Sequence, residues 1–253
     1  MKALITGASS GIGRDMAYYL ADLGYDLILV ARRKERLEEI KNNVKVNVKI
    51  IVLDLLQEKN VFELHKKVEK ENIDILINNA GFGLFGMFSK TDLNRELEMI
   101  DLNIKAYHIL TKLFLIDFMK KDHGYILNVC SSAGFLAGPR LNTYYATKNY
   151  ITKLTMAIYE ELKHQNSHVH ISALCPGPVA TEFNQVAHGV FSIKEMPSEK
   201  VAKYAIDKMF KKKLIIVPGW SVKLGLFFNR FAPWKLSMTI TYLIQKRKYP
   251  EEK

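Results

Sequence analysis

The hydrophobic positions along the chain follow two alternating patterns. Short, nearly continuous apolar runs lie at residues 3–5, 26–31, 48–53 and 73–77. A longer segment follows each run, and its apolar residues recur every three or four positions, as Ile12, Met16 and Leu20 do after the first run. Continuous apolar runs are typical of strands buried on both faces of a parallel sheet, and the longer segments predict helices. The alternation therefore predicts an α/β fold with a doubly wound parallel sheet.

The second half of the chain continues this alternation less regularly. A helix is expected at residues 198–210, capped by Ser198 with Val201 and Ala202 facing inward, and a last strand at 214–217. A chain of 253 residues that is 48% hydrophobic and 25% charged can bury a full core. We therefore expect one domain over residues 1–253.

The turn after the first strand has the composition of a phosphate site. Residues 6–13 are Thr-Gly-Ala-Ser-Ser-Gly-Ile-Gly and open the first helix. Glycines let a pyrophosphate approach the main chain, and the helix N-terminus attracts it. The spacing departs from the Gly-x-Gly-x-x-Gly fingerprint and lacks the Lys-Ser/Thr ending of a P-loop, so an ordinary tight turn stays open as an alternative. The expected cofactor contacts here are Gly7, Ser9, Ser10, Gly11, Ile12 and Gly13.

The end of the second strand indicates which dinucleotide binds. In a Rossmann-type fold, an acidic residue at this position binds the ribose 2′-hydroxyl, whereas arginine accommodates a 2′-phosphate. Here Ala31 is followed by Arg32 and Arg33. They favour NADP(H), with Arg32 beside the adenosine ribose and Arg33 adding positive field. The alternative is that both only begin the solvated helix at 34–43, although positive charge at a helix start opposes the dipole.

The ends of the third and fourth strands add further candidate contacts. Asp54 follows the third strand, where its carboxylate can accept from the adenine amino group, and Leu55 lies next to it. Residues 78–81, Asn-Asn-Ala-Gly, follow the fourth strand, although turns also contain Asn and Gly for other reasons. Ligands of doubly wound sheets bind at the carboxyl ends of the strands. The expected contacts at the fourth strand are Asn79, Ala80 and Gly81.

Together with later motifs, this pattern resembles the short-chain dehydrogenase/reductase family. The chain has Asn103 in a long helical segment, Ser131 after the fifth strand and Tyr-x-x-x-Lys at 144–148. Ser131 precedes the tyrosine by thirteen residues, as the family's serine does, and Pro-Gly-Pro-Val-Ala-Thr at 176–181 follows the sixth strand. The resemblance extends to about residue 181. It implies a catalytic group of Asn103, Ser131, Tyr144 and Lys148 and nicotinamide-side contacts from Pro176, Gly177, Val179 and Thr181.

The catalytic chemistry also follows from the residues. Tyr144 and Lys148 are four residues apart, so they share one face of a helix. The neighbouring cation is expected to lower the pKa of Tyr144 below the usual ~10. Tyr144 can then act as general acid in carbonyl reduction and as base in the reverse direction, while Ser131 hydrogen-bonds the same oxygen. The resemblance adds that Lys148 holds the nicotinamide ribose and that Asn103 supports a water-linked proton relay.

Charge and hydropathy limit the possible binding partners and cellular location only in part. Lysine and arginine outnumber aspartate and glutamate 37 to 26, and the net charge of +11 suits an anionic ligand, nucleic acid or an anionic membrane surface. No uncharged apolar run reaches the ~18 residues of a membrane-spanning helix. The first residues enter a strand without signal-peptide composition, so a cytoplasmic protein is expected.

Histidine and cysteine are not predicted to form a metal or nucleophilic site. His164, His168 and His170 have metal-like spacing, but they span a helix end and a strand start without a partner carboxylate, so no metal is expected. Cys130 and Cys175 lie in apolar runs with no basic environment apparent in the sequence. We expect reduced packing thiols there.

The pattern loosens after residue 181. Residues 182–197 fall where family members carry a mobile loop over the substrate. Residues 220–253 are rich in aromatic and aliphatic side chains, carry Lys-Arg-Lys at 246–248 and are expected to form two short helices hinged at Pro233. Two roles stay open for this extension: packing over the substrate cleft or against another subunit, and a basic, amphipathic contact with a membrane surface.

These features predict an NADP(H)-dependent oxidoreductase that interconverts a carbonyl and a secondary alcohol, with reduction as the expected direction. The apolar loop and extension favour an apolar substrate over a sugar. A non-catalytic nucleotide-sensing protein of the same fold and a membrane-surface protein stay open as alternatives. No nucleic-acid partner is expected, because no nucleic-acid module signature occurs. The resemblance implies a homodimer or homotetramer through the helices that carry Asn103 and Tyr144.

Overall fold

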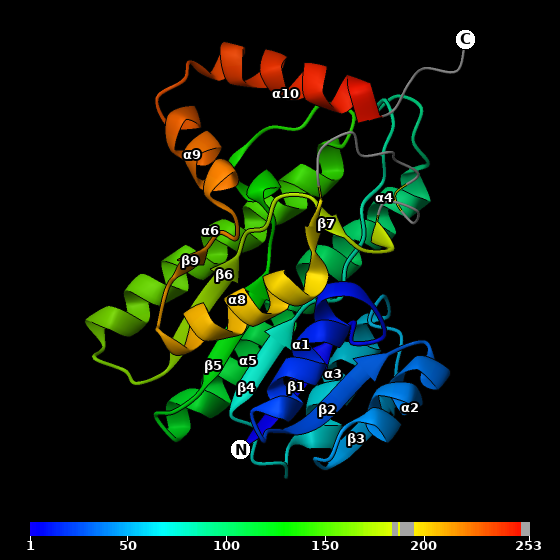
Figure 1. The fold of residues 1–253 in the computed structure, drawn as a ribbon, viewed down its shortest axis with the longest axis vertical. Coiled ribbons are helices and arrows are strands. Elements are labelled where there is room, and N and C mark those ends of the chain that lie inside the picture. The colour runs from blue at the N-terminus through cyan, green and yellow to red at the C-terminus, as the bar shows by residue number, and fades with distance from the viewer. Residues whose placement is uncertain (184–186, 188–194, 249–253) are drawn as a thin grey trace.

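The centre of the fold is a sheet whose neighbouring strands all run parallel (Figure 1). The computed structural model describes residues 1–183, 187 and 195–248. The seven strands of this sheet follow the order β3-β2-β1-β4-β5-β6-β9. The prediction of a doubly wound parallel sheet is confirmed. The strands are β1 (Lys2–Thr6), β2 (Asp26–Ala31), β3 (Val48–Val52), β4 (Ile75–Asn78), β5 (Tyr125–Val129), β6 (His170–Leu174) and β9 (Ile215–Ile216), and β7 (Val179–Ala180) pairs separately with β8 (Met196–Pro197).

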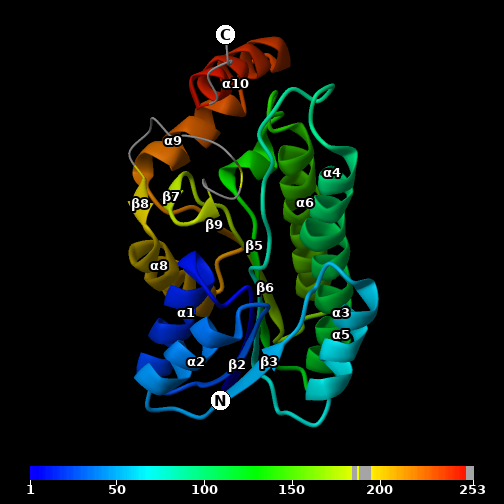
Figure 2. The same ribbon diagram turned by 90° about the vertical axis from the view of Figure 1, so that its right-hand side faces the viewer.

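Helices cover both faces of the sheet (Figure 2). Helices α1, α2 and α8 pack on one face, and α3, α5 and α6 pack on the other. The helices are α1 (Gly11–Asp22), α2 (Lys34–Asn43), α3 (Glu58–Val68), α4 (Leu93–Ile100), α5 (Tyr107–Lys120), α6 (Asn142–His164), α8 (Ser198–Phe210), α9 (Trp220–Asn229) and α10 (Trp234–Lys248). A π-helical turn, Asp101–Ala106, joins α4 to α5, and a short 3₁₀ turn, Ser132–Phe135, follows β5.

Strand β2 shows why a continuous apolar run becomes a central strand. Leu27 and Leu29 belong to the core under α1 and α8, whereas Ile28 and Val30 belong to the core under α3 and α5. All four side chains are at most 1% exposed. Successive side chains of a strand point to opposite faces, and here both faces are covered, so each of these positions is apolar.

The bounds of most elements agree with the sequence pattern. Strand β2 and helix α2 have the predicted bounds, and the extension forms two helices on either side of Pro233, as predicted. The prediction that Ser198 caps α8 is wrong: Ser198 is the first helical residue, and Pro197, whose φ is −55°, precedes it. Proline sets the helix entrance here through its fixed φ. Most of the predicted loop at 182–197 lies outside the described residues.

Four buried polar side chains join β4 and β5 to the helices beneath them. Asn78 Nδ2 donates to Asn128 Oδ1 at 2.9 Å and to Thr111 Oγ1 at 3.1 Å. Asn128 Nδ2 donates to Thr155 Oγ1 on α6 at 2.9 Å. All four residues are at most 1% exposed. Since a buried amide without a partner is costly, this network fixes the two strand ends that lead into the site.

Replacing Asn128 by alanine should lower the free energy of unfolding by about 2–4 kcal/mol, because the Asn78 amide and the Thr155 hydroxyl both lose a buried partner. Urea-induced unfolding at pH 7 measures this change. The matched control is Asn43→Ala at the exposed end of α2, which should change stability by less than about 0.5 kcal/mol. Equal losses in both variants would show that the network contributes no more than a surface amide.

Candidate active site

A cleft with a cavity volume of about 410 Å³ opens at the carboxyl ends of β1, β2, β4 and β5. Every predicted site residue lines it except Gly13 and Asn103. These two lie directly behind the lining: a Cβ on Gly13 would come within 2.3 Å of Asn79 Nδ2, and Asn103 Oδ1 accepts from the backbone N of Phe82 at 3.1 Å. Motifs that are far apart in the sequence therefore meet at one site.

Hydrogen bonds join the glycine turn to the end of β4. Thr6 Oγ1 accepts from the backbone N of Asn79 at 2.9 Å and of Ala80 at 3.2 Å. Asn79 Nδ2 donates in turn to the carbonyls of Thr6 and Gly7, at 3.0 and 3.1 Å. Gly7 has φ +63°, and a Cβ there would lie 2.7 Å from Ala80 Cα, so this approach requires glycine. Asn79 thus holds the turn in place beside α1.

The same turn fits a pyrophosphate. A Cβ on Gly11, whose φ is +54°, would lie 2.9 Å from Thr181 Cγ2, so the turn closely approaches the 176–181 segment. Ser10 occupies the N-cap position of α1 but makes no side-chain hydrogen bond to the helix. Without a side-chain cap, the first amides of α1 are available to an anionic ligand.

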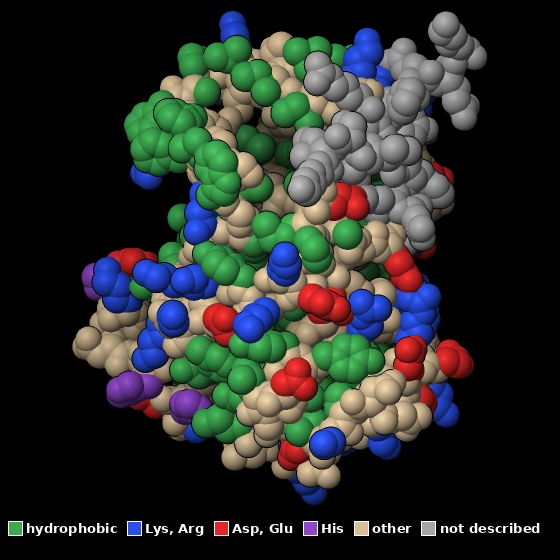
Figure 3. Space-filling view, viewed as in Figure 1, with side chains coloured by type: hydrophobic (Ala, Val, Ile, Leu, Met, Phe, Trp, Pro, Cys, Tyr) green, Lys and Arg blue, Asp and Glu red, His purple; other side chains and the backbone are tan. Residues whose placement is uncertain are grey.

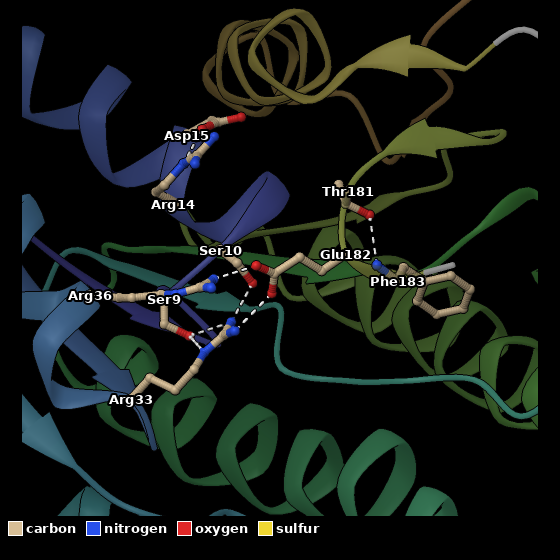
Figure 4. A network of polar contacts seen from close by, with 9 residues as sticks. All are labelled: Ser9, Ser10, Arg14, Asp15, Arg33, Arg36, Thr181, Glu182 and Phe183. Carbon is tan, nitrogen blue, oxygen red and sulfur yellow. Dashed lines mark hydrogen bonds and ion pairs between the residues drawn. The ribbon is translucent and has the colours of Figure 1, made fainter. Parts of the chain in front are cut away.

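Arg33 forms the most extensive polar contacts of the cleft (Figure 4). Its Nε donates to Ser9 Oγ at 3.2 Å and its Nη2 donates to Ser10 Oγ at 2.8 Å. Its Nη1 pairs with Glu182 Oε2 at 2.8 Å, and Arg36 pairs with the other oxygen of the same carboxylate. Hydrogen bonds from Arg36 and Arg33 lower the pKa of Glu182 to about 2. Arg33 therefore lies on the phosphate turn and already binds an anionic group.

Arg32 has a different environment. Its Nη1 lies 3.8 Å from Asp54 Oδ2, and its side chain is 68% exposed. The sequence placed Arg32 nearest the ribose phosphate and Arg33 further away. In the structure Arg33, rather than Arg32, contacts the two serines of the turn.

The residues predicted to be catalytic converge at the inner wall of the cleft. Tyr144 and Lys148 lie on α6, and the Lys148 Nζ lies 5.8 Å from the centre of the Tyr144 ring and donates to the Val129 carbonyl at 2.8 Å. Ser131 follows β5 and lines the same cavity as Tyr144. A Cβ on Gly81 would lie 2.8 Å from Asn103 Oδ1 and 3.7 Å from Lys148 Nζ, so both side chains approach Gly81 closely.

The π-helical turn between α4 and α5 places Asn103 in the core. Asn103 is fully buried, and its Nδ2 donates to the Phe82 carbonyl at 2.9 Å and to Thr147 Oγ1 at 3.2 Å. With Oδ1 bound to the backbone N of Phe82, the amide links the end of β4 to the helix that carries Tyr144 and Lys148. These contacts give Asn103 a positioning role, and a proton relay through it stays a prediction.

Burial dominates the titration of the catalytic pair. It raises the pKa of Tyr144 above its usual value, and the hydrogen bond with Ser131 opposes this shift only in part. The prediction that the pKa of Tyr144 is lowered is wrong for the protein alone, because burial of the phenol is the largest cause and raises its pKa. Burial also lowers the pKa of Lys148 to about 8.

The neighbouring Tyr145 has a structural role. Its hydroxyl accepts a hydrogen bond from Gln245 Nε2 of α10 at 2.6 Å, and burial raises its pKa to about 12. Tyr145 is thereby tied to the C-terminal extension, whereas Tyr144 contacts Ser131. That Tyr144, and not Tyr145, is the acid/base residue stays a prediction.

The environments of the histidines and cysteines differ from those predicted. His164 and His168 do have carboxylate partners, Glu160 at 3.3 Å and Asp122 at 2.6 Å, and the described residues contain no group of three potential metal ligands. Both cysteines are buried, as expected for packing thiols. Burial raises the pKa of Cys130, but a hydrogen bond with Cys175 and the charge of Lys148 together lower it, and neither neighbour is apparent from the local sequence.

The residues that line the cleft beyond those predicted include Phe82, Arg95 and Gln245. The Arg95 guanidinium lies 4.1 Å from the centre of the Phe82 ring. Phe82 directly follows the 78–81 motif, and this adjacency was a usable signal in the sequence. Arg95 and Gln245 lie on α4 and α10, and no local pattern indicates that these helices reach the cleft.

A phosphate-binding turn and a Ser-Tyr-Lys group in one cleft of a doubly wound sheet define a dinucleotide-binding protein of the Rossmann type. Comparisons with known proteins agree. The family model described as "short chain dehydrogenase" matches residues 1–188. The NADP-dependent 3-hydroxy acid dehydrogenase YdfG of Escherichia coli (strain K12) is 33% identical over 191 residues, which cover 74% of this chain and 76% of that protein.

Solved structures show the same likeness. A short-chain dehydrogenase from Sphingobium yanoikuyae in complex with NADPH matches with a TM-score of 0.82 at 27% identity, over 91% of this chain and 93% of that one. The bulky-bulky ketone specific alcohol dehydrogenase from Comamonas testosteroni matches with a TM-score of 0.79 at 29% identity, over 91% and 92%. The chain belongs to the short-chain dehydrogenase/reductase family. It is therefore an oxidoreductase of alcohols and carbonyls, for which NAD(P)(H) is the typical cofactor.

Replacing Lys148 by methionine should raise the free energy of unfolding at pH 7 while abolishing turnover. A pKa that falls from 10.5 to about 8 on folding means that the protonated side chain destabilises the fold by about 3 kcal/mol. Since the Val129 carbonyl loses its donor in the variant, we expect a net gain of about 1–3 kcal/mol.

The gain should depend on pH. Between pH 8 and 10.5 the unfolded chain binds more protons at Lys148 than the folded one, so the wild-type penalty decreases as pH rises through this range. Urea unfolding at pH 7 and pH 10 measures both values, with Lys112→Met on the exposed side of α5 as control. A Lys148→Met variant that is no more stable than the wild type at pH 7 would contradict the buried-charge account.

Proposed function

We propose that the protein is an NADP(H)-dependent reductase of apolar ketones or aldehydes, with Tyr144 as general acid. The observation that carries this proposal is the arrangement of one cleft. Tyr144, Ser131 and the buried Lys148 line the same cavity as the glycine turn and Arg33.

The chemistry follows from the positions of these side chains. The nicotinamide supplies a hydride when bound. Ser131 and Tyr144 hydrogen-bond the carbonyl oxygen of the substrate, and Tyr144 donates its proton as negative charge develops there. The Lys148 ammonium, 5.8 Å from the ring of Tyr144, stabilises the phenolate that remains. In the oxidative direction the same tyrosine accepts the proton from the alcohol.

Two features favour NADP(H): the position of Arg33 and the lack of an acidic side chain at the end of β2. Ala31 leaves no carboxylate at the position that would repel a 2′-phosphate. The guanidinium of Arg33 lies on the phosphate turn, paired with the carboxylate of Glu182. A 2′-phosphate would replace that carboxylate as the anionic partner. The relatives from E. coli and Sphingobium, named for NADP dependence and an NADPH complex, support this preference.

An apolar substrate suits the side of the cleft that faces Tyr144. Phe183 lies 5.2 Å from the Tyr144 ring centre, and Phe82, Leu102 and Leu141 also line the cavity. Such a lining binds hydrocarbon or aromatic groups more readily than a sugar. The ketone specificity in the name of the Comamonas relative supports the same substrate class.

Loss of the Tyr144 hydroxyl tests the proposal. Tyr144→Phe should lower kcat for carbonyl-dependent NADPH oxidation by at least about 10²-fold, because general acid catalysis contributes 10²–10⁴-fold. NADPH affinity, measured by fluorescence titration, should change less than about threefold, because the Tyr144 hydroxyl contributes little to cofactor binding. The matched control is Tyr150→Phe on the exposed side of α6. A protein that binds NADPH but oxidises none of a panel of apolar ketones and aldehydes would be a nucleotide sensor.

Comparing the two arginines tests the cofactor assignment. Arg33→Ala should reduce kcat/KM for NADPH by about tenfold to a hundredfold, the equivalent of a charge-assisted hydrogen bond of about 1.5–3 kcal/mol. The value for NADH should be nearly unchanged, because NADH lacks the 2′-phosphate. Arg32→Ala is the neighbouring control and should have the smaller effect. A larger effect of Arg32→Ala would show that Arg32 binds the 2′-phosphate, as the sequence predicts. A wild-type preference for NADH would contradict a 2′-phosphate role for either arginine.

A further inference from the structure

Helices α9 and α10 present an apolar surface at the end of the molecule where the cleft opens. Figure 3 shows hydrophobic side chains gathered over both helices, whereas charged side chains of both signs cover the opposite half of this face. Eleven large apolar side chains between residues 220 and 244 are at least 38% exposed. They are Trp220, Leu224, Phe227, Phe228, Phe231, Trp234, Leu236, Ile240, Tyr242, Leu243 and Ile244. We call this the tail surface.

Helix α10 buries polar side chains and exposes apolar ones, the reverse of an ordinary surface helix. Ser237, Thr241 and Gln245 are spaced four residues apart and share one face, and Thr241 and Gln245 are buried at 6% and 1% exposure. Ile240 and Leu243, on other sides of the helix, are 47% and 53% exposed. A helix that packs polar side chains inward and apolar side chains outward is unfavourable in water. The outward face therefore requires a covering partner.

Helix α9 adds an aromatic group to the same surface. Val222 and Leu226 pack against the core, whereas Phe227, Phe228 and Phe231 are 57–71% exposed and contact one another edge-to-face. The tryptophans Trp220 and Trp234 lie at the starts of the two helices. Exposed tryptophan and phenylalanine at helix ends are typical of segments that lie at a lipid–water interface.

Charge identifies the partner. Residues 220–248 contain no Asp or Glu, and their cationic residues are Lys223, Arg230, Lys235, Lys246, Arg247 and Lys248. A second copy of this chain docked on the same surface would bring two such cationic segments together. An anionic lipid surface satisfies both requirements, because it buries the aromatic side chains and pairs with the cations.

The position of the tail surface relates it to the cleft. Gln245 lines the cavity and donates to Tyr145, the neighbour of Tyr144, and the Arg140 guanidinium lies 5.7 Å from the centre of the Tyr242 ring. Among the described helices, none is both long and apolar enough to cross a membrane. The two helices can therefore lie along a membrane but not span it.

We propose that the tail surface binds the protein to anionic membranes, with α9 and α10 in the headgroup region and the cleft at the membrane side of the molecule. The proposal does not require catalysis, so it stands or falls separately from the reductase function. It makes the bilayer a source from which an apolar substrate can reach the cleft without crossing water.

Vesicle cosedimentation of the full chain tests the proposal. The probes are vesicles of phosphatidylcholine alone and vesicles that also contain phosphatidylglycerol. We expect the partition coefficient for phosphatidylglycerol vesicles to be at least about tenfold higher, and to fall as salt is raised, because several cations contact the headgroups. Equal binding to both vesicles, or no binding to either at low salt, would overturn the proposal.

Matched substitutions locate the contact. Phe228→Ser with Phe231→Ser should lower the partition coefficient at least about tenfold, since each removes an exposed aromatic ring from the interface. The control pair, Phe62→Ser with Phe88→Ser, replaces phenylalanines that are also exposed but lie outside the extension. Likewise Arg230→Glu with Lys235→Glu should abolish the preference for phosphatidylglycerol, whereas Lys45→Glu with Lys112→Glu should not. Equal effects of a test pair and its control would contradict the assigned surface.

The alternative is that a second copy of this chain covers the tail surface. Sedimentation velocity without lipid determines the oligomeric state of the wild type and of the phenylalanine variants. A dimer that the Phe228→Ser, Phe231→Ser variant converts to monomer, in a protein that does not bind vesicles, would show that a second copy covers the tail surface. An unchanged oligomeric state together with loss of vesicle binding supports the membrane assignment.

Discussion

The site depends on an ammonium group that is buried without a carboxylate partner among the residues around it that the structure describes. Lys148 is 4% exposed, donates to the carbonyl of Val129 and lies 5.1 Å from the centre of the Tyr107 ring. Burial lowers its pKa to about 8. Because little water screens it, this charge acts strongly on a phenol or carbonyl oxygen that becomes negative nearby. The same lack of water makes the charged lysine destabilising, so the surrounding structure has to hold it in place.

Two contacts between α6 and the end of β5 provide this support. Lys148 binds the Val129 carbonyl, and Thr155, seven residues further along α6, binds the side chain of Asn128 at 2.9 Å. Residues seven apart lie on the same face of a helix, and Asn128 and Val129 are consecutive at the strand end. The helix is thereby fixed to the strand both at the reactive side chain and two turns away from it. The Asn128 network thus supports the geometry of the site as well as the stability of the sheet.

The features that sequence predicts well are those that depend on local spacing. Strand β2 is recognisable because both of its faces are buried, and the pairing of Tyr144 with Lys148 follows from helical periodicity. The features that it misses depend on tertiary placement. The pKa of Tyr144 is raised because layers from distant parts of the chain exclude water, and no local pattern reports this. The different contacts of Arg32 and Arg33 depend on side-chain direction, because successive residues at a strand end point to opposite sides.

One polar contact explains the orientation of the C-terminal extension. Tyr145 is buried, so its hydroxyl needs a hydrogen-bond partner, which Gln245 provides at 2.6 Å. This bond fixes the rotation of α10, because Thr241 and Gln245 are one turn apart and turn inward together. The apolar side chains on the rest of the helix must then face outward. A contact made one residue from the catalytic tyrosine thus sets which face of α10 is exposed. Anything that binds the tail surface therefore binds a helix attached directly to α6, the helix that carries Tyr144 and Lys148.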